Sequence, residues 1–356
     1  MNRQTHLVLE NEFVKLLPLQ FYHLEALLLI AKQQPDLLKY SPSPFGDREK
    51  VELYIKAALQ QRLQGNRYPF VIWSKKYQRI VGSTSYGNIA LAHQRLEIGW
   101  TWIEKTVQGT GLNQQCKFLL LSYAFEKLNL ERVEFKIDDR NEASKKAVLK
   151  IGGQKEGILR SHTLMRDGFR RDTTYFGILK TDWPDHKNKI FNGFKLFPSQ
   201  QQPFQETLRL SPLKGTKTAP MDLLSLADPD ESSIKKYISK SETWLVYQED
   251  HLLGCCLVLR KGPKASIENI AIYPTYQGLG IGQYLLQNII EIYTKQGVQE
   301  LQIATANTSV GQLYLYQKMG FSIQEINKNH FVKNNTQPLM ENGLEVKDQI
   351  VLALYC

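Results

Sequence analysis

The sequence predicts an α/β protein that contains one ligand-binding unit twice. Two glycine-rich stretches, 108–113 (QGTGLN) and 277–282 (QGLGIG), are nearly the same. Each lies between a strand-like apolar run and an amphipathic helix. Gln277 follows Gln108 by 277 − 108 = 169 residues, and Asn307 follows Asn141 by 307 − 141 = 166. Landmarks at a nearly constant offset indicate an internal duplication.

The length agrees with this interpretation. At about 150 residues per domain, a chain of 356 residues predicts two domains. Residues 187–216 are polar and rich in proline and glutamine, without a sustained helical or strand period. We therefore expect a first domain over 1–186, a linker over 187–216 and a second domain over 217–356.

Composition excludes several classes of protein. The net charge is +10, but basic residues alternate with acidic ones and no helix carries a one-sided basic stripe, so no nucleic-acid partner is expected. The charge suits a ligand with phosphates. No apolar run approaches ~18 residues, and the first residues lack the apolar segment of a signal peptide, so no membrane association is expected. The four cysteines and seven histidines show no disulfide or zinc spacing, which predicts a reducing cytoplasm and no metal.

The predicted elements follow the same order in both halves. In the first half, apolar and polar residues alternate over 96–102, a helical apolar face begins at Leu112, a strand covers 132–137, and a helix covers 141–149. In the second half we expect a strand over 266–272, a helix after the loop at 277–282, a strand over 300–304 and a helix over 309–319. Strands that alternate with helices predict a partly parallel sheet.

The glycine loops have a physical use at the start of a helix. Free N–H groups and the helix dipole attract a phosphate there, and glycine allows both positive φ angles and close approach of the ligand. A pyrophosphate is the natural ligand, although an ordinary glycine turn is the alternative. The P-loop and dinucleotide-binding patterns are absent. The pattern present is Q-x-x-G-x-G, with Asn113 in place of the last glycine in the first half.

This pattern resembles the GNAT superfamily of acetyl-CoA-dependent N-acetyltransferases, whose hallmark is Q/R-x-x-G-x-G/A. Over 6–186, motifs such as 95–102 (RLEIGWTW) and 141–144 (NEAS) resemble the RimJ/RimL-like branch. Over 217–356, motifs such as 268–272 (ENIAI) and 316–321 (YQKMGF) resemble small single-domain bacterial members. The resemblance implies two tandem GNAT domains, each with helices flanking a mixed sheet whose bulged central strand splays from its neighbour.

The resemblance also implies which residues bind acetyl-CoA, the expected cosubstrate. Its pantetheine would pair with exposed strand backbone, and its pyrophosphate would lie on the glycine loop. The implied cofactor-binding residues are Gln108, Gly109, Gly111, Asn113 and Asn141 in the first half, and Ile270, Ile272, Gln277, Gly278, Gly280, Gly282 and Asn307 in the second. For the two asparagines, simple helix capping is the alternative.

An amine acceptor must lose a proton before it attacks a thioester, so a carboxylate base is useful. Glu97 lies 108 − 97 = 11 residues before Gln108, where several GNAT enzymes carry their catalytic glutamate. The same spacing in the second half gives Ser266, and Glu268, two residues on, would share its strand face at about 7 Å. Glu268 could then act through a water. For both residues the alternative is a solvated glutamate at the edge of the sheet.

The expected proton donor shows the opposite pattern. Tyr316 matches the family tyrosine near the sulfur of coenzyme A, whereas the matching residue of the first half is Val148. Ser144 resembles the donor serine of RimL-like enzymes. A core aromatic and a surface helix residue are the respective alternatives. Trp100, Trp102 and the hairpin at 164–169 are candidates to line the first pocket, although tryptophans on strands usually belong to the core.

Cysteine chemistry is not expected, because Cys116 lies on an apolar helix face and Cys255 and Cys256 lie in a strand-like run. The sequence thus predicts direct acetyl transfer in a ternary complex, with no acyl-enzyme. The acceptor would be a protein or peptide α-amine, or a small molecule with a primary amine. In the alternative hypothesis one domain only binds acetyl-CoA or substrate, as a sensor. The first domain is favoured for that role because it has Asn113 in its loop and lacks the tyrosine.

Overall fold

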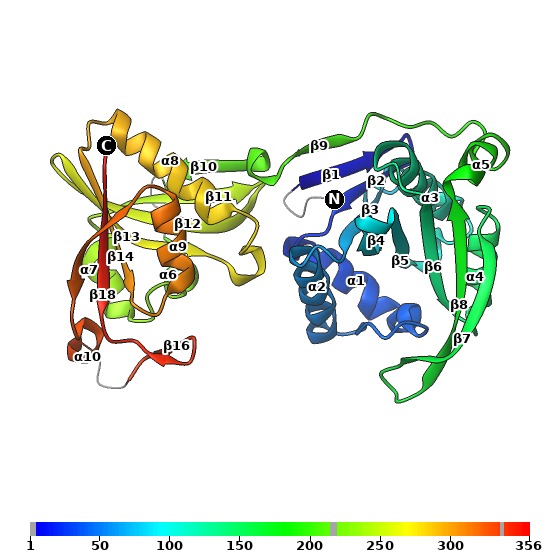
Figure 1. Ribbon diagram of the computed structural model, residues 1–356, viewed down its shortest axis with the longest axis horizontal. Helices are drawn as coiled ribbons and strands as arrows, with labels where there is room; N and C mark the ends of the chain where they lie inside the picture. Colours follow the sequence, from blue (N-terminus) through cyan, green and yellow to red (C-terminus); the bar gives the residue numbers. More distant parts are fainter. Residues whose placement is uncertain (1–4, 214–218, 335–337) are drawn as a thin grey trace. The chain divides into compact units, whose positions relative to one another are not determined.

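The computed structural model describes residues 5–213, 219–334 and 338–356, and it divides into two compact units, Met1–Pro203 and Phe204–Cys356 (Figure 1). The division falls inside the segment expected to be a linker. That segment instead carries two strands, β9 (Gln200–Pro203) and β10 (Leu208–Pro212), one in each unit. All four residues of β9 are exposed, so the strand is held by backbone hydrogen bonds and leaves no alternating pattern in the sequence.

The first unit is built on a nine-stranded sheet in the order β7-β8-β6-β5-β4-β3-β2-β1-β9. β5 and β6 pair in parallel, and the other neighbours pair antiparallel. Besides β9, the strands are β1 (Thr5–Glu10), β2 (Val14–Pro18), β3 (Tyr68–Ser74), β4 (Arg79–Ala90), β5 (Arg95–Ile103), β6 (Arg132–Asp138), β7 (Gln154–Leu164) and β8 (Arg170–Leu179).

Helices cover both faces of this sheet. One core is formed with α1 and α2 and includes Leu27, Tyr54 and Trp102; the other is formed with α3 and includes Cys116 and Phe135. The helices are α1 (Leu24–Gln33), α2 (Arg48–Leu63), α3 (Leu112–Ser122), α4 (Glu142–Leu149) and α5 (Trp183–Lys189). The predicted strands and helices of the first half are confirmed, with boundaries shifted by one or two residues.

The second unit has a seven-stranded sheet in the order β10-β11-β12-β13-β14-β18-β15 and a separate hairpin of β16 and β17. Besides β10, its strands are β11 (Glu242–Gln248), β12 (His251–Lys261), β13 (Lys264–Ile272), β14 (Glu300–Ala306), β15 (Ser322–Asn327), β16 (Met340–Glu341), β17 (Leu344–Glu345) and β18 (Gln349–Tyr355). Its helices are α6 (Met221–Leu224), α7 (Glu231–Ile238), α8 (Ile281–Lys295), α9 (Val310–Lys318) and α10 (His330–Asn334). The predicted α/β class holds in both units.

In each unit the one parallel strand pair opens partway along its length. β5 pairs with β6 only over 95–97, and β13 pairs with β14 only over 264–267. Each central strand also carries a bulge just beyond that point, at Trp100–Thr101 opposite Thr84 and at Glu268. The expectation of a splayed and bulged central strand is therefore confirmed, and the backbone edge beyond the parallel pairing is available to a ligand.

Candidate functional site

The two loop glutamines fix their loops to the central strands in the same way. Gln108 Nε2 donates to the carbonyl oxygen of Ile103 at 2.8 Å, and Gln277 Nε2 donates to that of Ile272 at 3.1 Å. Ile103 and Ile272 are the last residues of β5 and β13. Each glutamine thus holds its glycine loop at the end of the splayed strand.

The loop glycines have the backbone conformations that the sequence requires of them. The φ angles are +79° at Gly109, +86° at Gly111, +75° at Gly278 and +83° at Gly280. α3 and α8 begin directly after the second glycine of each loop. In the first unit, no atom lies within 4 Å of the positions where side chains on Gly109 and Gly111 would begin. That loop is open to an anion approaching the helix N-terminus.

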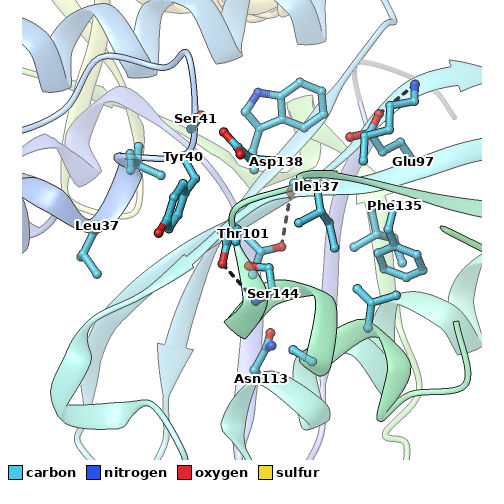
Figure 2. A pocket seen from close by; sticks show the side chains of 18 of the residues that line it. Leu37, Tyr40, Ser41, Glu97, Thr101, Asn113, Phe135, Ile137, Asp138 and Ser144 are labelled. Carbon is cyan, nitrogen blue, oxygen red and sulfur yellow. Dashed lines mark hydrogen bonds and ion pairs between the residues drawn. The ribbon is translucent and has the colours of Figure 1, made fainter. Parts of the chain in front are cut away.

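A cavity of about 250 Å³ lies where β5 and β6 separate (Figure 2). The loop between α1 and α2 supplies one wall with Leu37, Tyr40 and Ser41, and α3 and α4 supply another. Three of the predicted site residues line it together with Glu97: Asn113, Asn141 and Ser144. The structure therefore brings the base candidate, the donor candidate Ser144 and two of the cofactor candidates into one cavity, whereas Gln108, Gly109 and Gly111 do not line it.

Glu97 is buried, with 6% of its surface exposed, so the alternative of a solvated glutamate is wrong. Its Oε2 accepts a hydrogen bond from Asn88 Nδ2 at 2.6 Å and forms an ion pair with Lys136 Nζ at 3.1 Å. Its Oε1 lies over Gly99, only 2.6 Å from where a β-carbon on that glycine would be. The carboxylate is thus oriented by two groups on one oxygen, and its other oxygen lies beside the bulged strand.

Sequence reasoning missed Lys117, which lines the same cavity from α3. The side chain is 6% exposed, and its Nζ donates to Thr101 Oγ1 on the bulge at 2.7 Å. Burial lowers the pKa of Lys117 to about 8, so the group can both hold and release a proton near neutral pH. A signal was present in the sequence, because Lys117 is the one charged residue in the stretch 116–125 (CKFLLLSYAF).

The structure places the other predicted site residues of this cavity, Asn113, Asn141 and Ser144, in different surroundings. Asn141 Oδ1 accepts from the backbone N–H of Ser144 at 3.1 Å and caps α4, so the capping interpretation is confirmed, although Asn141 also lines the cavity. Ser144 and Thr101 both line the cavity and are labelled in Figure 2. The buried Oδ1 of Asn113 has no hydrogen-bond partner among the described residues. Such an atom beside a cavity calls for a donor that a ligand can supply.

The two tryptophans differ. Trp100 lines the cavity, with a φ of +50° at the bulge, and its ring packs so closely on Gly87 that a β-carbon there would lie 2.1 Å from it. Trp102 belongs to the core under α1 and α2, and its Nε1 lies 3.3 Å from the Tyr54 hydroxyl. The hairpin at 164–169 supplies no residue to the described wall of the cavity.

In the second unit, Ser266 lies at the position that Glu97 occupies in the first. Glu97 pairs with Glu134 and Ser266 pairs with Gln302, and 302 − 134 = 168 matches the repeat offset. The Ser266 hydroxyl donates to Glu268 Oε1. The residue expected as a substitute base is therefore joined to the serine that stands in place of the glutamate.

Tyr316 lies on α9 and is 4% exposed. Burial, with a smaller contribution from Cys256, raises the pKa of its hydroxyl, which keeps the proton on the oxygen at neutral pH. Its ring lies 6.4 Å from that of Phe321, which is compatible with the core-aromatic alternative as well.

The predicted cofactor residues of the second unit are only partly free. Ile270 and Ile272 pair with β12 on one side and leave the edge toward β14 open. Asn307 Oδ1 accepts from the backbone N–H groups of Lys347 and Asp348, at 3.2 and 3.1 Å, so this oxygen has a structural use. The remaining two, Gly280 and Gly282, have close neighbours that the first loop lacks.

Gly280 is contacted by Gln205, whose Nε2 donates to the Gly280 carbonyl oxygen at 3.1 Å. The same Nε2 lies 2.8 Å from where a β-carbon on Gly280 would be. Gly282 faces Leu315, whose Cδ2 would lie 3.4 Å from such a β-carbon. The second loop is therefore more crowded than the first.

The cysteines have the packing role that the sequence predicts. Cys116, Cys255 and Cys256 are fully buried. Burial raises the pKa of the Cys116 and Cys255 thiols to about 12 and that of Cys256 well above its usual range. These thiols are poor nucleophiles near neutral pH. Within 5–213, 219–334 and 338–356, no helix is long and apolar enough to cross a membrane, and no cluster of metal-ligating side chains is found.

Each half of the chain matches a known protein family. Residues 14–154 match the family described as "Acetyltransferase (GNAT) domain", and residues 216–321 match "Acetyltransferase (GNAT) family". The uncharacterized N-acetyltransferase YvbK of Bacillus subtilis is 34% identical over 150 residues, which is 42% of this chain and 97% of that protein. The chain belongs to the GNAT family. It carries two GNAT domains, as the sequence predicted, and its relatives are named N-acetyltransferases.

Two further similar proteins are a named N-acetyltransferase and a solved structure. The [ribosomal protein bS18]-alanine N-acetyltransferase of Haemophilus influenzae is 34% identical over 86 residues, 24% of this chain and 58% of that protein. A solved GNAT acetyltransferase of Elizabethkingia anophelis, with acetyl-CoA bound, is 36% identical and matches 42% of this chain and 99% of its own, with a TM-score of 0.41.

Proposed function

We propose that the first domain transfers an acetyl group from acetyl-CoA to a primary amine by direct attack in a ternary complex. The observation that carries this proposal is the placement of two buried groups, Glu97 and Lys117, around one cavity at the splay of β5 and β6. One group is suited to accept a proton and the other to donate one. A domain that only bound the cofactor through its glycine loop would have no use for a buried proton acceptor and a buried proton donor in one cavity.

The residues present in the first domain fit acetyl-CoA. Gly109 and Gly111 leave room for a pyrophosphate at the start of α3, and Gln108 holds that loop in place. Asn113 offers an unpaired acceptor at the cavity wall, and the unpaired edge of β5 is suited to a pantetheine amide. When bound, acetyl-CoA supplies the activated acetyl thioester.

The chain's own groups then have distinct tasks. Glu97 Oε1 accepts the proton of the acceptor amine, while Asn88 and Lys136 hold Oε2. Lys117 Nζ donates a proton toward the departing thiolate, and Thr101 keeps Nζ at the bulge. Ser144 is the second donor candidate, as its resemblance to RimL-like enzymes implies. The pKa of about 8 for Lys117 suits a proton donor near neutral pH.

We propose a related arrangement for the second domain. Tyr316 is the proton donor, and Glu268 acts as base through a water, oriented by Ser266. Gly278, Gly280 and Gly282, with the backbone of Ile270 and Ile272, would hold acetyl-CoA after Gln205 moves from Gly280. If one domain only binds, the second fits that role better than the first, because Ser266 stands at the position of the base.

The acceptor is a primary amine on a small molecule or at a protein N-terminus. Relatives named for acetylation of ribosomal protein bS18 support the protein N-terminus as one candidate. The test is an acceptor panel of small amines and N-terminal peptides, assayed with the full chain and acetyl-CoA by mass spectrometry and by thiol release. Acetylated amine with stoichiometric thiol supports the proposal. Thiol release without acetylated product, or no turnover of any acceptor, would contradict it.

A further inference from the structure

A second cavity of about 560 Å³ adjoins the transfer site of the first domain, and it is basic. Arg67, Arg95 and Lys136 line it, along with amide side chains that include Gln61, Gln64 and Asn66. None of the described residues in its wall is acidic. A pocket with this lining attracts anions.

Arg67 is the cation of this cavity that forms no direct ion pair in the described part of the chain, and the carboxylate of Glu97 stabilises its charge only through space. Arg67 is 4% exposed, and the hydrogen-bond partners that the structure describes for it are all neutral. Its Nε donates to Ser85 Oγ at 2.9 Å, while its terminal nitrogens lie 3.4 Å from the Tyr54 hydroxyl and 3.5 Å from Gln61 Oε1. A buried cation with such partners is costly unless an anion neutralises it.

The other two cations each form an ion pair with an acidic residue, whereas Arg67 forms none among the described residues. Arg95 forms an ion pair with Glu134 at 3.3 Å, and Lys136 forms one with Glu97 at 3.1 Å. The Arg67 guanidinium also stacks on the Trp100 ring, 4.5 Å from its centre, which holds it at the cavity wall. A guanidinium fixed in this way matches the paired oxygens of a carboxylate or phosphate.

The basic cavity and the cavity that holds Glu97 are neighbours, because they share wall residues. Trp100 and Lys136 line both cavities. Asn88, in the wall of the basic cavity, donates to the carboxylate of Glu97, which lines the transfer cavity. A ligand that occupies the basic cavity therefore lies next to the group that would take the proton of an acceptor amine.

We propose that this cavity binds the anionic end of the acceptor, so that the first domain acetylates small primary amines that also carry a carboxylate or a phosphate. This inference rests on the proposed function and narrows its acceptor. The polar lining and the lack of acidic groups in the described wall disfavour polyamines and neutral amines. The anion on Arg67 and the amine beside Glu97 would hold the acceptor at both ends.

Matched pairs of acceptors test this directly with the full chain. Phosphoethanolamine is compared with ethanolamine, and γ-aminobutyrate with butylamine, by initial rates of acetyl transfer. We expect kcat/KM for at least one anionic member to exceed that of its neutral partner by about tenfold or more. The pair that shows the preference tells phosphate from carboxylate. Equal or better use of both neutral amines would overturn the inference while leaving the transferase proposal intact.

Binding gives a readout that does not depend on turnover. Calorimetry with phosphoethanolamine, γ-aminobutyrate and inorganic phosphate should detect binding of at least one, with loss of binding in Arg67→Gln. If anions bind but no amine is acetylated, the anion site stands and the proposed function fails. If none of the three binds, the inference fails whatever the enzyme does.

Because Arg67 is buried, its replacement could impair folding, and an exposed position provides the second variant. Gln64→Glu places a carboxylate in the cavity wall on an exposed residue. We expect about tenfold lower kcat/KM for the preferred anionic amine and little change for its neutral partner. Gln33→Glu is the control, since Gln33 is equally exposed at the end of α1 but lies outside the cavity wall. An equal effect of both variants would count against the site.

Discussion

The two domains share one scaffold but place the proposed proton donor on different helices. In the first, Lys117 on α3 enters the cavity and Val148 lies on α4. At the equivalent positions of the second, 117 + 169 gives Leu286 on α8 and 148 + 168 gives Tyr316 on α9. The polar residue and the apolar residue of this pair of positions have thus exchanged helices. If Lys117 and Tyr316 are the proton donors that we propose, either of the two helices can supply the donor.

A second difference between the domains concerns the size of two side chains near the glycine loop. Asn113 and Ala147 line the first cavity together, whereas the second domain places Gly282 against Leu315. The larger residue of the pair is thus on the helix that follows the glycine loop in the first domain, and on the other helix in the second domain.

The largest effects are expected when the two glycine loops are blocked one at a time. Gly111→Glu and Gly280→Glu each add bulk and negative charge at a positive-φ position where phosphate is expected. We expect each variant to lose one of two acetyl-CoA sites per chain, measured by calorimetry on the full chain. A stoichiometry of one in the unmodified chain would show that one domain does not bind, and the variant without effect would identify it.

Loss of the base should have the next largest effect. In a full chain whose second domain is silenced by Gly280→Glu, Glu97→Gln should lower turnover ~10²–10⁴-fold with little change in acetyl-CoA affinity. Glu131→Gln, on an exposed glutamate paired with Lys180, is the control. Unchanged turnover in Glu97→Gln would assign the buried carboxylate a structural role only.

Lys117 should contribute through its proton. Lys117→Met in the same background should lower turnover by about 10²-fold, and Lys127→Met, at an exposed position, should not. A donor must be protonated, so activity of the unmodified domain should fall as pH rises through about 8. Lys117→Arg keeps its charge at that pH, and the alkaline decline should disappear. A decline that persists in Lys117→Arg would remove the lysine from the proton path.

The proposed site of the second domain can be tested in a full chain whose first domain is inactivated by Gly111→Glu. Tyr316→Phe should lower its turnover by about 10–10²-fold, while Tyr314→Phe, on the exposed side of the same helix, should have no effect. Glu268→Gln then decides whether the carboxylate beside Ser266 acts as the base. Full activity in both Tyr316→Phe and Glu268→Gln would leave the second domain without its assigned site.

The smallest effect is expected from changing the size of the side chains at positions 113 and 147. Asn113→Gly alone should weaken acetyl-CoA binding several-fold, because it leaves a gap and removes an acceptor at the loop. Asn113→Gly with Ala147→Leu copies the second domain and should recover part of the affinity. The acetyl-CoA affinity of both variants is measured by calorimetry. If the double variant bound acetyl-CoA more weakly than the single variant, the proposed pairing of the two positions would be wrong.

The sequence was sufficient for the duplication, the central elements and the glycine loops, because periodicity and glycine spacing report local geometry. It could not show that Glu97 is buried with Lys136, since the two are brought together by parallel strand pairing. Lys117 was missed because a helical period shows which face is apolar and not where two strands separate. Arg67 precedes β3 in the sequence, and only the fold places it against Trp100.

The edge strands decide how the protein can be divided for experiments. A fragment that begins at residue 217 would lose β10, which pairs with β11 along 208–212, and buried Phe204. It would also lose Gln205 from the loop at Gly280 and the Leu208 carbonyl that accepts from the Tyr284 hydroxyl on α8. A fragment that ends at 186 would lose β9 from the edge at β1 and Phe191 from its core. Cleavage between Pro203 and Phe204 spares both sheets, so protein engineers who want separate domains should cut there.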